Sequence, residues 1–333
     1  MNKMHHVKIN QLALNLVQKL INNEHYYNAK VNKLESGATV IDVTNGSWNA
    51  GKLVGEICMG GLATVEFSTF NLNTHFFPAV NVYTSHPIIS CLASQLAGWS
   101  VKLKKEVEKD GIMKKKVVFQ SLGSGPARAK AKMEKLFEEI EYTDESDCAV
   151  IVFESREMPN DEVMSIISEK CQVNSENTYA VCAPTASLVG SIQVAARIVE
   201  TGIHKLHEIK FPLDILIDGF GTVPIAPIAK DDFAAMGPPN DAMFAVGQTF
   251  YTINVEKERE EEIFNLIKKA PASTSSSYGK PFNDIFKEAE YDFYKIDPGL
   301  FAPAIYTINN KKTGKTLTFG KRDEELLKLS FKL

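Results

Sequence analysis

The order of apolar and polar residues predicts helices and strands in alternation along the chain. Apolar residues spaced three and four apart predict helices at 10–22, 49–59, 87–98, 126–140, 160–171, 191–206, 256–269 and from about 280 onward. Alternating or short continuous apolar runs predict strands at 38–43, 62–70, 77–85, 99–121 (a hairpin turning at Asp110-Gly111), 147–155, 178–184, 213–221 and 243–254. A last hairpin and helix end the chain. This pairing of elements predicts an α/β (α+β) protein with two sub-structures.

Capping residues mark the expected ends of several helices. Asn10 is placed to cap helix 10–22, and the pair Gly60-Gly61 can take the left-handed conformation that ends helix 49–59. Pro126 suits the first turn of the helix that follows "LGSG". We therefore expect these three boundaries to be sharp.

The composition is that of an ordinary globular protein. Its 333 residues are enough for two domains, 44% of them are hydrophobic and 23% are charged. The net charge of −4 predicts no nucleic-acid partner and no membrane partner. The N-terminal "MNKMHHVKIN" lacks the apolar core of a signal peptide, so we expect a cytoplasmic protein.

The cysteines and histidines predict neither disulfides nor a metal site. The 5 cysteines include no CxxC pair, which favours buried, reduced thiols. The 7 histidines are scattered, without HExxH or a comparable ligand spacing.

A polar stripe runs along the predicted helix 191–206. Gln193, Arg197, Glu200 and His204 fall on one face, and His207 extends it, while apolar residues occupy the opposite face. An Arg and a Glu three residues apart are common on helix surfaces. In a cleft, however, the carboxylate could act as a general base toward water, with the Arg keeping it ionised. The pattern leaves both interpretations open.

A second candidate site lies in "QSLGSGPARAKAK". Gly123, Ser124 and Gly125 precede a helix whose first turn holds Arg128, one of only five arginines in a lysine-rich chain. Backbone N–H groups at a helix N-terminus together with a guanidinium could bind an anion. The alternative is a plain tight connection into a helix.

Four further segments invite a functional interpretation. Cys58 and Cys91 lie in apolar stretches, and either could be a nucleophile if a base such as His86 were near, or simply a buried thiol. "DGFGTVPIAP" is expected to be a loop at the end of a strand, where α/β proteins often bind ligands. The Ser-rich "APASTSSSYGKPF" is expected to be an ordered loop or a lid.

Several blocks together resemble one family, methenyltetrahydromethanopterin cyclohydrolase. They are "CMGGLA" (58–63), "HPIISCLASQLAGW" (86–99), "GSGPARA" (123–129), "APTASLVGSIQVAARIVET" (183–201), "YGKPF" (278–282) and "YDFYKIDPGLFAPA" (291–304). The blocks stand in order across the full length. The sequence departs from the family's pattern at "SHP" (85–87) and in the loops 219–227 and 236–243, which leaves the pterin variant open.

The resemblance implies a reaction and its residues. Such enzymes hydrolyse a methenyl-tetrahydromethanopterin to the formyl derivative without a metal or other cofactor, tetrahydromethanopterin being the carrier of the substrate. The block "ARIVE" places the catalytic pair on Arg197 and Glu200. The other candidates for substrate binding are Gly60, Gly61, Ser94, Gln95, Gly123, Ser124, Gly125, Arg128, Ser187, Gln193, Tyr278 and Lys280. For Gly123–Gly125 and Arg128, the expected ligand is the phosphate of the substrate's tail, inferred from the anion site above.

The resemblance also implies an architecture. We expect a homotrimer of subunits with two intertwined α/β domains and a substrate pocket between them, the first domain at 1–142 plus 300–333 and the second at 143–299. Two other functions remain open: a non-catalytic pterin-binding protein, and a thiol-dependent amidohydrolase that uses Cys58 or Cys91.

Overall fold

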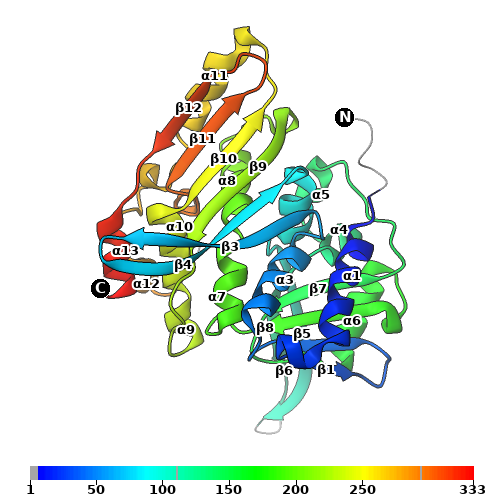
Figure 1. Cartoon of the computed structure of the whole chain (residues 1–333). Helices are drawn as coiled ribbons and strands as arrows, with labels where there is room; N and C mark the ends of the chain where they lie inside the picture. The colour runs from blue at the N-terminus through cyan, green and yellow to red at the C-terminus, as the bar shows by residue number, and fades with distance from the viewer. Residues whose placement is uncertain (1–6, 110–111, 293–294) are drawn as a thin grey trace. The chain divides into compact units, whose positions relative to one another are not determined.

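The chain forms two compact α/β units, so the predicted fold class is confirmed. The computed structural model describes residues 7–109, 112–292 and 295–333 (Figure 1). Unit 1 consists of Met1–Gly61 and Ala93–Pro184, and unit 2 of Leu62–Leu92 and Thr185–Leu333. Each unit is thus assembled from two segments of the chain.

These limits differ from the expected domain boundaries. Residues 143–184 belong to unit 1, because their strands pair with strands from earlier in the chain. Residues 62–92 and 300–333 belong to unit 2, because their strands pair with the strands at 216–224 and 248–253. The division of the chain into two units follows from pairing between strands that are far apart in the sequence, and local composition does not predict such pairing.

Unit 1 is built on a six-stranded sheet in the order β1-β2-β8-β7-β6-β5. The strands are β1 (Lys30–Lys33), β2 (Thr39–Asp42), β5 (Trp99–Lys109), β6 (Ile112–Ser124), β7 (Ala149–Glu154) and β8 (Thr178–Ala183). The central strands β2, β8 and β7 are parallel, and both outer pairs are antiparallel. The runs "AVIVF" and "YAVCA" within these strands are apolar because central parallel strands are covered on both faces.

The helices of unit 1 confirm most of the predicted elements. They are α1 (Ile9–Asn22), α2 (Glu24–Tyr27), α3 (Trp48–Cys58), α4 (Ala127–Ala131), α5 (Leu136–Glu139) and α6 (Asp161–Cys171). The predicted helix 126–140 is wrong as one element, since it is divided between α4 and α5. Gly60 and Gly61 have φ of 65° and 70°, as expected of a helix-ending pair.

The capping role predicted for Asn10 is wrong. Asn10 lies inside α1, fully buried, and its amide donates to the carbonyl of Pro126 while its side-chain oxygen accepts from the Val150 N–H. The carboxylate of Asp144, from a distant loop, accepts the Asn10 N–H instead. The residues around Asn10 cannot reveal that the capping carboxylate comes from residue 144, far away in the sequence.

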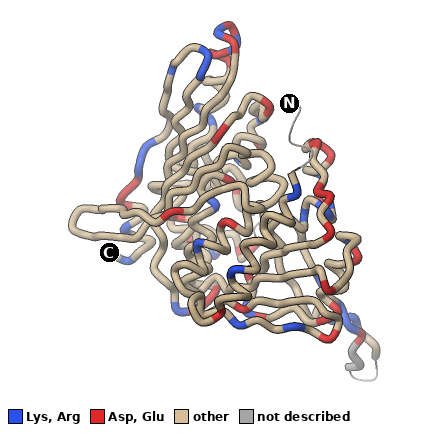
Figure 2. The backbone as a smooth tube through the Cα atoms, turned by 45° about the vertical axis from the view of Figure 1, so that its right-hand side comes forward, with Lys and Arg blue, Asp and Glu red and all other residues tan. Residues whose placement is uncertain are grey.

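The β5–β6 hairpin carries a concentration of lysines (Figure 2). Its predicted turn, Asp110-Gly111, lies outside the described residues. Lys102, Lys104, Lys105, Lys115 and Lys116 are exposed. β5 is the edge of its sheet and β6 pairs with β7 only at Gly123 and Ser124, so these charges protect strand edges from further pairing.

Unit 2 contains a second six-stranded sheet, in the order β12-β11-β10-β9-β4-β3. Its strands are β3 (Ala63–Leu72), β4 (His75–Thr84), β9 (Leu216–Pro224), β10 (Gln248–Ile253), β11 (Ile305–Asn310) and β12 (Thr316–Gly320). Only β10 and β11 pair in parallel. The predicted strand 243–254 begins too early, because residues up to Val246 belong to a helix.

The helices of unit 2 are α7 (Leu188–Ala195), α8 (Ile198–Glu208), α9 (Asp232–Ala235), α10 (Gly237–Val246), α11 (Lys257–Ile267), α12 (Phe282–Glu288) and α13 (Glu324–Phe331). The predicted helix at 87–98 is a π-helix, η1 (Ile88–Gln95), along which the chain passes from unit 2 into unit 1. π-Turns of this kind recur at functional sites. Within the described residues, no helix combines the length and apolar character needed to cross a membrane.

Candidate active site

The polar stripe lies where α7 ends and α8 begins. The predicted single helix 191–206 is wrong as one element, because Ala196 and Arg197 have ψ of −7° and 0° and separate two helices. The Arg197 N–H donates to the Val194 carbonyl, three residues back, and the Arg197 carbonyl accepts from Thr201 to start α8. The break sets Arg197 at the junction of the two helices.

Three side chains of the stripe meet at this junction, and they are shielded from solvent. Arg197 Nη2 lies 3.4 Å from Gln193 Oε1, and Arg197 Nη1 lies 3.9 Å from Glu200 Oε2. The side chains of Arg197 and Glu200 are 12% and 6% exposed. A separation of 3.9 Å is a charge–charge contact and too long for a hydrogen bond.

This burial excludes the interpretation of the junction as ordinary helix surface. An ionised carboxylate in so little contact with water needs a nearby cation, and the Arg197 guanidinium supplies one. His204 and His207, further along α8, are only partly buried. His204 Nδ1 lies 3.9 Å from Glu208 Oε1, on the outer part of the helix. The chemistry of the stripe therefore concentrates in Gln193, Arg197 and Glu200.

The two cysteines considered as nucleophiles are both buried. Cys91, in η1, is inaccessible, and burial raises the pKa of its thiol far above its usual range, with a further contribution from the charge of Glu200. Cys58 is 1% exposed at the end of α3. A thiol that stays protonated at neutral pH is a poor nucleophile, which weighs against the thiol-dependent alternative.

Eight of the predicted binding residues come together inside unit 1. Segments 58–61, 94–95 and 123–128 converge, so that Ser94 Oγ donates to the Cys58 carbonyl and Ser124 Oγ to the Gln95 carbonyl, both at 2.6 Å. The Gly125 N–H donates to the Ser94 carbonyl. The members of this cluster are Gly60, Gly61, Ser94, Gln95, Gly123, Ser124, Gly125 and Arg128. We call it the unit 1 polar cluster.

Arg128 holds this cluster together from within. Its side chain is fully buried, Nε donates to Glu134 Oε1 at 2.6 Å, and Nη1 donates to the Ser94 carbonyl at 3.0 Å. The guanidinium also lies over the ring of Phe137. A phosphate at this guanidinium would have to compete with these partners. The N–H groups of the predicted phosphate site are also engaged, since the Gly125 N–H donates to the Ser94 carbonyl and Gly123 and Ser124 lie in β6, where they pair with β7.

The other predicted binding residues lie in unit 2. Ser187 caps α7, its hydroxyl accepting the Gly190 N–H. Tyr278 donates its hydroxyl to Asp323 Oδ2 at 3.2 Å, and Lys280 forms an exposed ion pair with Glu288. Burial and the charge of Asp323 raise the pKa of the Tyr278 phenol. Tyr278 and Lys280 thus have contacts that hold the segment before α12 in place.

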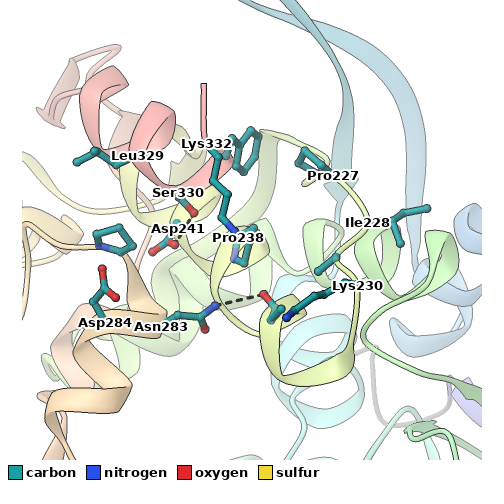
Figure 3. A pocket seen from close by; sticks show the side chains of 14 residues that line it. Pro227, Ile228, Lys230, Pro238, Asp241, Asn283, Asp284, Leu329, Ser330 and Lys332 are labelled. Atoms are coloured by element: carbon teal, nitrogen blue, oxygen red, sulfur yellow. Dashed lines mark hydrogen bonds between the residues drawn. The ribbon is translucent and has the colours of Figure 1, made fainter.

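A cavity of about 530 Å³ opens in unit 2 beside α10, α12 and α13 (Figure 3). Its lining includes none of the predicted catalytic or substrate-binding residues, but it includes Pro227, the last residue of "DGFGTVPIAP", where a ligand-binding loop is expected. Asp241 in this lining is buried and accepts from the Phe282 N–H and the Ser330 hydroxyl. Burial raises the pKa of Asp241 to about 7, with a smaller contribution from Asp284 and an opposing one from the two hydrogen bonds.

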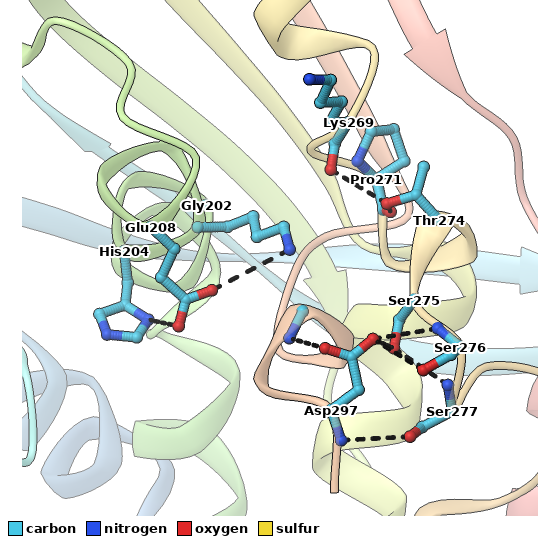
Figure 4. A network of polar contacts seen from close by, with 12 residues as sticks. Gly202, His204, Glu208, Lys269, Pro271, Thr274, Ser275, Ser276, Ser277 and Asp297 are labelled. Carbon is cyan, nitrogen blue, oxygen red and sulfur yellow. Dashed lines mark hydrogen bonds and ion pairs between the residues drawn. The ribbon is translucent and has the colours of Figure 1, made fainter.

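The Ser-rich segment is ordered around one carboxylate. Asp297 accepts from the hydroxyls of Ser275 and Ser276 and from the Ser276 and Gly299 N–H groups (Figure 4). These hydrogen bonds lower the pKa of Asp297. The first of the two expectations, an ordered loop, is therefore confirmed. Among the described residues no cluster of three or more His, Cys, Asp or Glu side chains could hold a metal ion.

Comparison with known proteins places this geometry in context. A family model described as "Cyclohydrolase (MCH)" matches residues 8–331. The methenyltetrahydromethanopterin cyclohydrolase of Methanocaldococcus jannaschii is 44% identical over 331 residues, which cover 97% of this chain and 98% of that protein. Proteins of the same name from Methanococcoides burtonii and Methanosarcina barkeri are 40% and 38% identical, each with 98% of both chains covered.

Proposed function

We propose, because the chain belongs to the MCH cyclohydrolase family, that it reversibly hydrolyses methenyl-tetrahydromethanopterin to formyl-tetrahydromethanopterin. The observation that carries the proposal is a similarity running through both units from end to end. The buried Arg197–Glu200 pair supports it further, because it has the charge and the shielding that a general base toward water requires.

The chemistry needs only water beside the substrate. The methenyl bridge is a cationic carbon between two nitrogens and is already electrophilic. A water oxygen forms a bond to this carbon while Glu200 accepts one proton. The hydroxyl proton of the adduct then moves to the leaving nitrogen as its bond to the carbon breaks, and Glu200 releases its proton to solvent. One cation and one water thus give the neutral formyl compound and one proton.

The charges around Glu200 fit this role. The carboxylate must be ionised to accept a proton, and the Arg197 guanidinium 3.9 Å away favours that state. Gln193, 3.4 Å from Arg197, helps to orient the guanidinium. A negative charge at Glu200 also stabilises the cationic substrate beside it.

The same proposal covers partners and location. We expect the pterin substrate as the ligand, a homotrimer as the assembly, and no nucleic-acid partner, membrane partner, metal or cofactor. We expect the protein in the cytoplasm. Sedimentation of the purified protein tests the trimer directly, since a monomer of 36.9 kDa and its trimer separate clearly.

The decisive experiment follows loss of the methenyl chromophore with the wild type and Glu200→Gln. We expect the variant to bind substrate and to turn over on the order of 100-fold more slowly, or worse, because the amide accepts no proton. Glu208→Gln is the matched control, since Glu208 lies on the outer part of the same helix and is 27% exposed. Equal turnover by the wild type and Glu200→Gln would show that Glu200 is not the base.

The same assay tests the two alternatives. A wild type that binds the methenyl compound without consuming it would be a pterin carrier, and the catalytic proposal would be wrong. Loss of activity in either Cys58→Ala or Cys91→Ala, with folding and substrate binding unchanged, would instead favour a thiol-dependent enzyme.

A further inference from the structure

The first turn of α8 packs against three glycine residues, which have no side chains. A Cβ at Gly221 of β9 would lie 2.8 Å from Ile198 Cγ2, and one at Gly219 would lie 2.9 Å from Val199 Cγ1. A Cβ at Gly247, just before β10, would lie 2.7 Å from the Met243 carbonyl oxygen in α10 and 2.8 Å from Ile198 Cδ1. Distances this short are within van der Waals repulsion. The three glycines therefore allow α8 to come closer to the sheet than any other residue would; we call Gly219, Gly221 and Gly247 the glycine seat.

The seat corrects the expectation that "DGFGTVPIAP" (218–227) is a loop over its whole length. Residues 216–224 form strand β9, in the interior of the sheet. Gly219 and Gly221 are buried toward α8, whereas Phe220 between them is 40% exposed on the opposite face. A glycine at every second position is thus present on the one face that α8 covers.

A tyrosine hydroxyl holds the same turn from the next strand. Tyr251 of β10 lies directly opposite Gly219 in the register, and its hydroxyl donates to the Val199 carbonyl at 2.9 Å. Its ring covers Gly219, a common way to compensate for a glycine within a sheet. A Cβ at Gly202, one turn along α8, would lie only 2.0 Å from this hydroxyl. The contact therefore needs glycine on the helix as well.

This contact is immediately next to the proposed base. Val199 precedes Glu200 in the chain, and Ile198 follows Arg197, so the two seat-contacting residues lie between the two catalytic candidates. Tyr251 is fully buried, and burial is the main cause of the raised pKa of its phenol, with the charge of Glu200 among the smaller causes.

We propose that the glycine seat and the Tyr251 hydroxyl are a positioning device that sets where Arg197 and Glu200 lie. The proposal rests on the catalytic role proposed for that pair. A displacement of about 1 Å in a catalytic group can cost on the order of 100-fold in rate. A methyl group added beneath Ile198 moves α8 outward, and the carboxylate of Glu200 moves with it.

The first test is Gly221→Ala, compared with Gly237→Ala. Gly237 is in the same unit, and a Cβ there would lie 2.7 Å from Asn283 Cγ, so this variant adds a methyl group in a close contact that does not involve α8. We expect kcat of Gly221→Ala to fall roughly 10- to 100-fold with KM within about 2-fold. We expect Gly237→Ala to keep kcat at equal folded fraction. Equal kcat in the two variants would overturn the proposal.

A second variant tests the proposal without a clash. Tyr251→Phe removes only the hydroxyl, and we expect kcat to fall about 10-fold while KM and the folded fraction stay close to the wild type. The pH at which kcat is half-maximal is expected to move as well, because the environment of Glu200 changes. An unchanged kcat and pH profile in this folded variant would overturn the role of Tyr251.

A double-mutant cycle separates positioning from general damage. If the seat acts through Glu200, adding Gly221→Ala to Glu200→Gln costs little further rate, whereas independent effects would multiply. Replacing Ile198 by Ala in the Gly221→Ala protein removes the clashing methyl groups and is expected to restore kcat at least partly. Multiplied losses and no such rescue would overturn the proposal.

The cycle also distinguishes this proposal from the one on which it rests. An active Glu200→Gln would remove the catalytic role of Glu200, whatever the glycine variants do. An inactive Glu200→Gln together with a fully active Gly221→Ala would leave Glu200 as the base and remove only the glycine seat.

Discussion

The unit 1 polar cluster and the α7–α8 junction of unit 2 both bury an arginine beside a glutamate, but with different geometry. Arg128 meets Glu134 at 2.6 Å and the Ser94 carbonyl at 3.0 Å, and the neighbouring serines donate to carbonyls at 2.6 Å. Arg197 meets Gln193 at 3.4 Å and Glu200 at 3.9 Å. The short, directional contacts of Arg128 stabilise the fold of unit 1. The longer contact between Arg197 and Glu200 is compatible with a carboxylate that must also accept a proton. Geometry, more than residue type, separates the two regions.

The largest effect on stability is expected at Asp241 in unit 2. Its carboxyl group is buried and accepts short hydrogen bonds, like the structural contacts of Arg128. Its pKa is raised from 3.8 to about 7, so the folded state retains a proton that the unfolded state loses at lower pH. The resulting stability is present below pH about 4 and declines as the pH rises to about 7, by about 4 kcal/mol in total.

In Asp241→Asn this dependence on pH disappears. We therefore expect the free energy of unfolding of the variant to rise relative to that of the wild type between pH 4.5 and 8. Urea unfolding at several pH values measures the difference. Asp214→Asn, at an exposed position in the same unit, is the matched control, because Asp214 is not among the groups that shift the pKa of Asp241. A stability difference that stays constant with pH would contradict the raised pKa.

Arg128→Lys is expected to have the next largest effect. Lysine keeps the charge but cannot donate to Glu134 and to the Ser94 carbonyl in the two directions that the guanidinium uses. We expect the free energy of unfolding to fall by roughly 3 kcal/mol, as measured in urea. The comparison would fail if Arg128→Lys unfolded like the wild type.

Arg197→Lys is the matched change at the junction. A lysine ammonium can preserve a charge–charge contact of this length, so the main loss is the hydrogen bond to Gln193, and the free energy of unfolding is expected to fall by about 1 kcal/mol. Turnover is expected to fall roughly 10- to 100-fold, because the ammonium does not orient the carboxylate as the guanidinium does. Steady-state kinetics beside urea unfolding give both numbers. A strongly destabilised but active Arg197→Lys would reverse the comparison.

Ser187 gives the smallest effect. Ser187 is the N-cap of α7, so Ser187→Ala is expected to lower the free energy of unfolding by about 1 kcal/mol. Ser187→Asp is expected to keep the wild-type stability, because aspartate also caps helices. Thermal unfolding of the two variants measures this. A rise in KM shared by both, with stability restored only in the aspartate variant, would add substrate binding to the capping role.

Most helices and strands could be predicted from the spacing of apolar residues, and each wrong prediction has an identifiable physical cause. Strand β2 and helix α6 fall within a residue or so of the predicted ends, because apolar spacing and local caps mark them. The break between α7 and α8 has no such mark, since "IQVAARIVE" contains neither glycine nor proline. Packing of the two helices within unit 2 overrides the helical preference of these residues there.

The candidate site shows the same division. Arg197 and Glu200 were named from the stripe and the resemblance, and the structure brings them together in a shielded position. Asp241 and Tyr251 were missed, because an aspartate in "PPNDAM" or a tyrosine in a strand carries no signal of its own. Their roles depend on partners such as Ser330 and Val199, far away in sequence.

The sequence by itself determined the class of fold, most of the elements, the family and the two residues of the proposed catalytic pair. Local periodicity and ordered sequence blocks suffice for these, because neighbouring residues specify both. Only the tertiary structure decided which strands share a sheet, that Arg128 faces inward, and that the glycines of "DGFG" lie beneath α8. These are relations between segments tens to hundreds of residues apart. Their physical basis is burial and close packing, which exist only once the chain has folded.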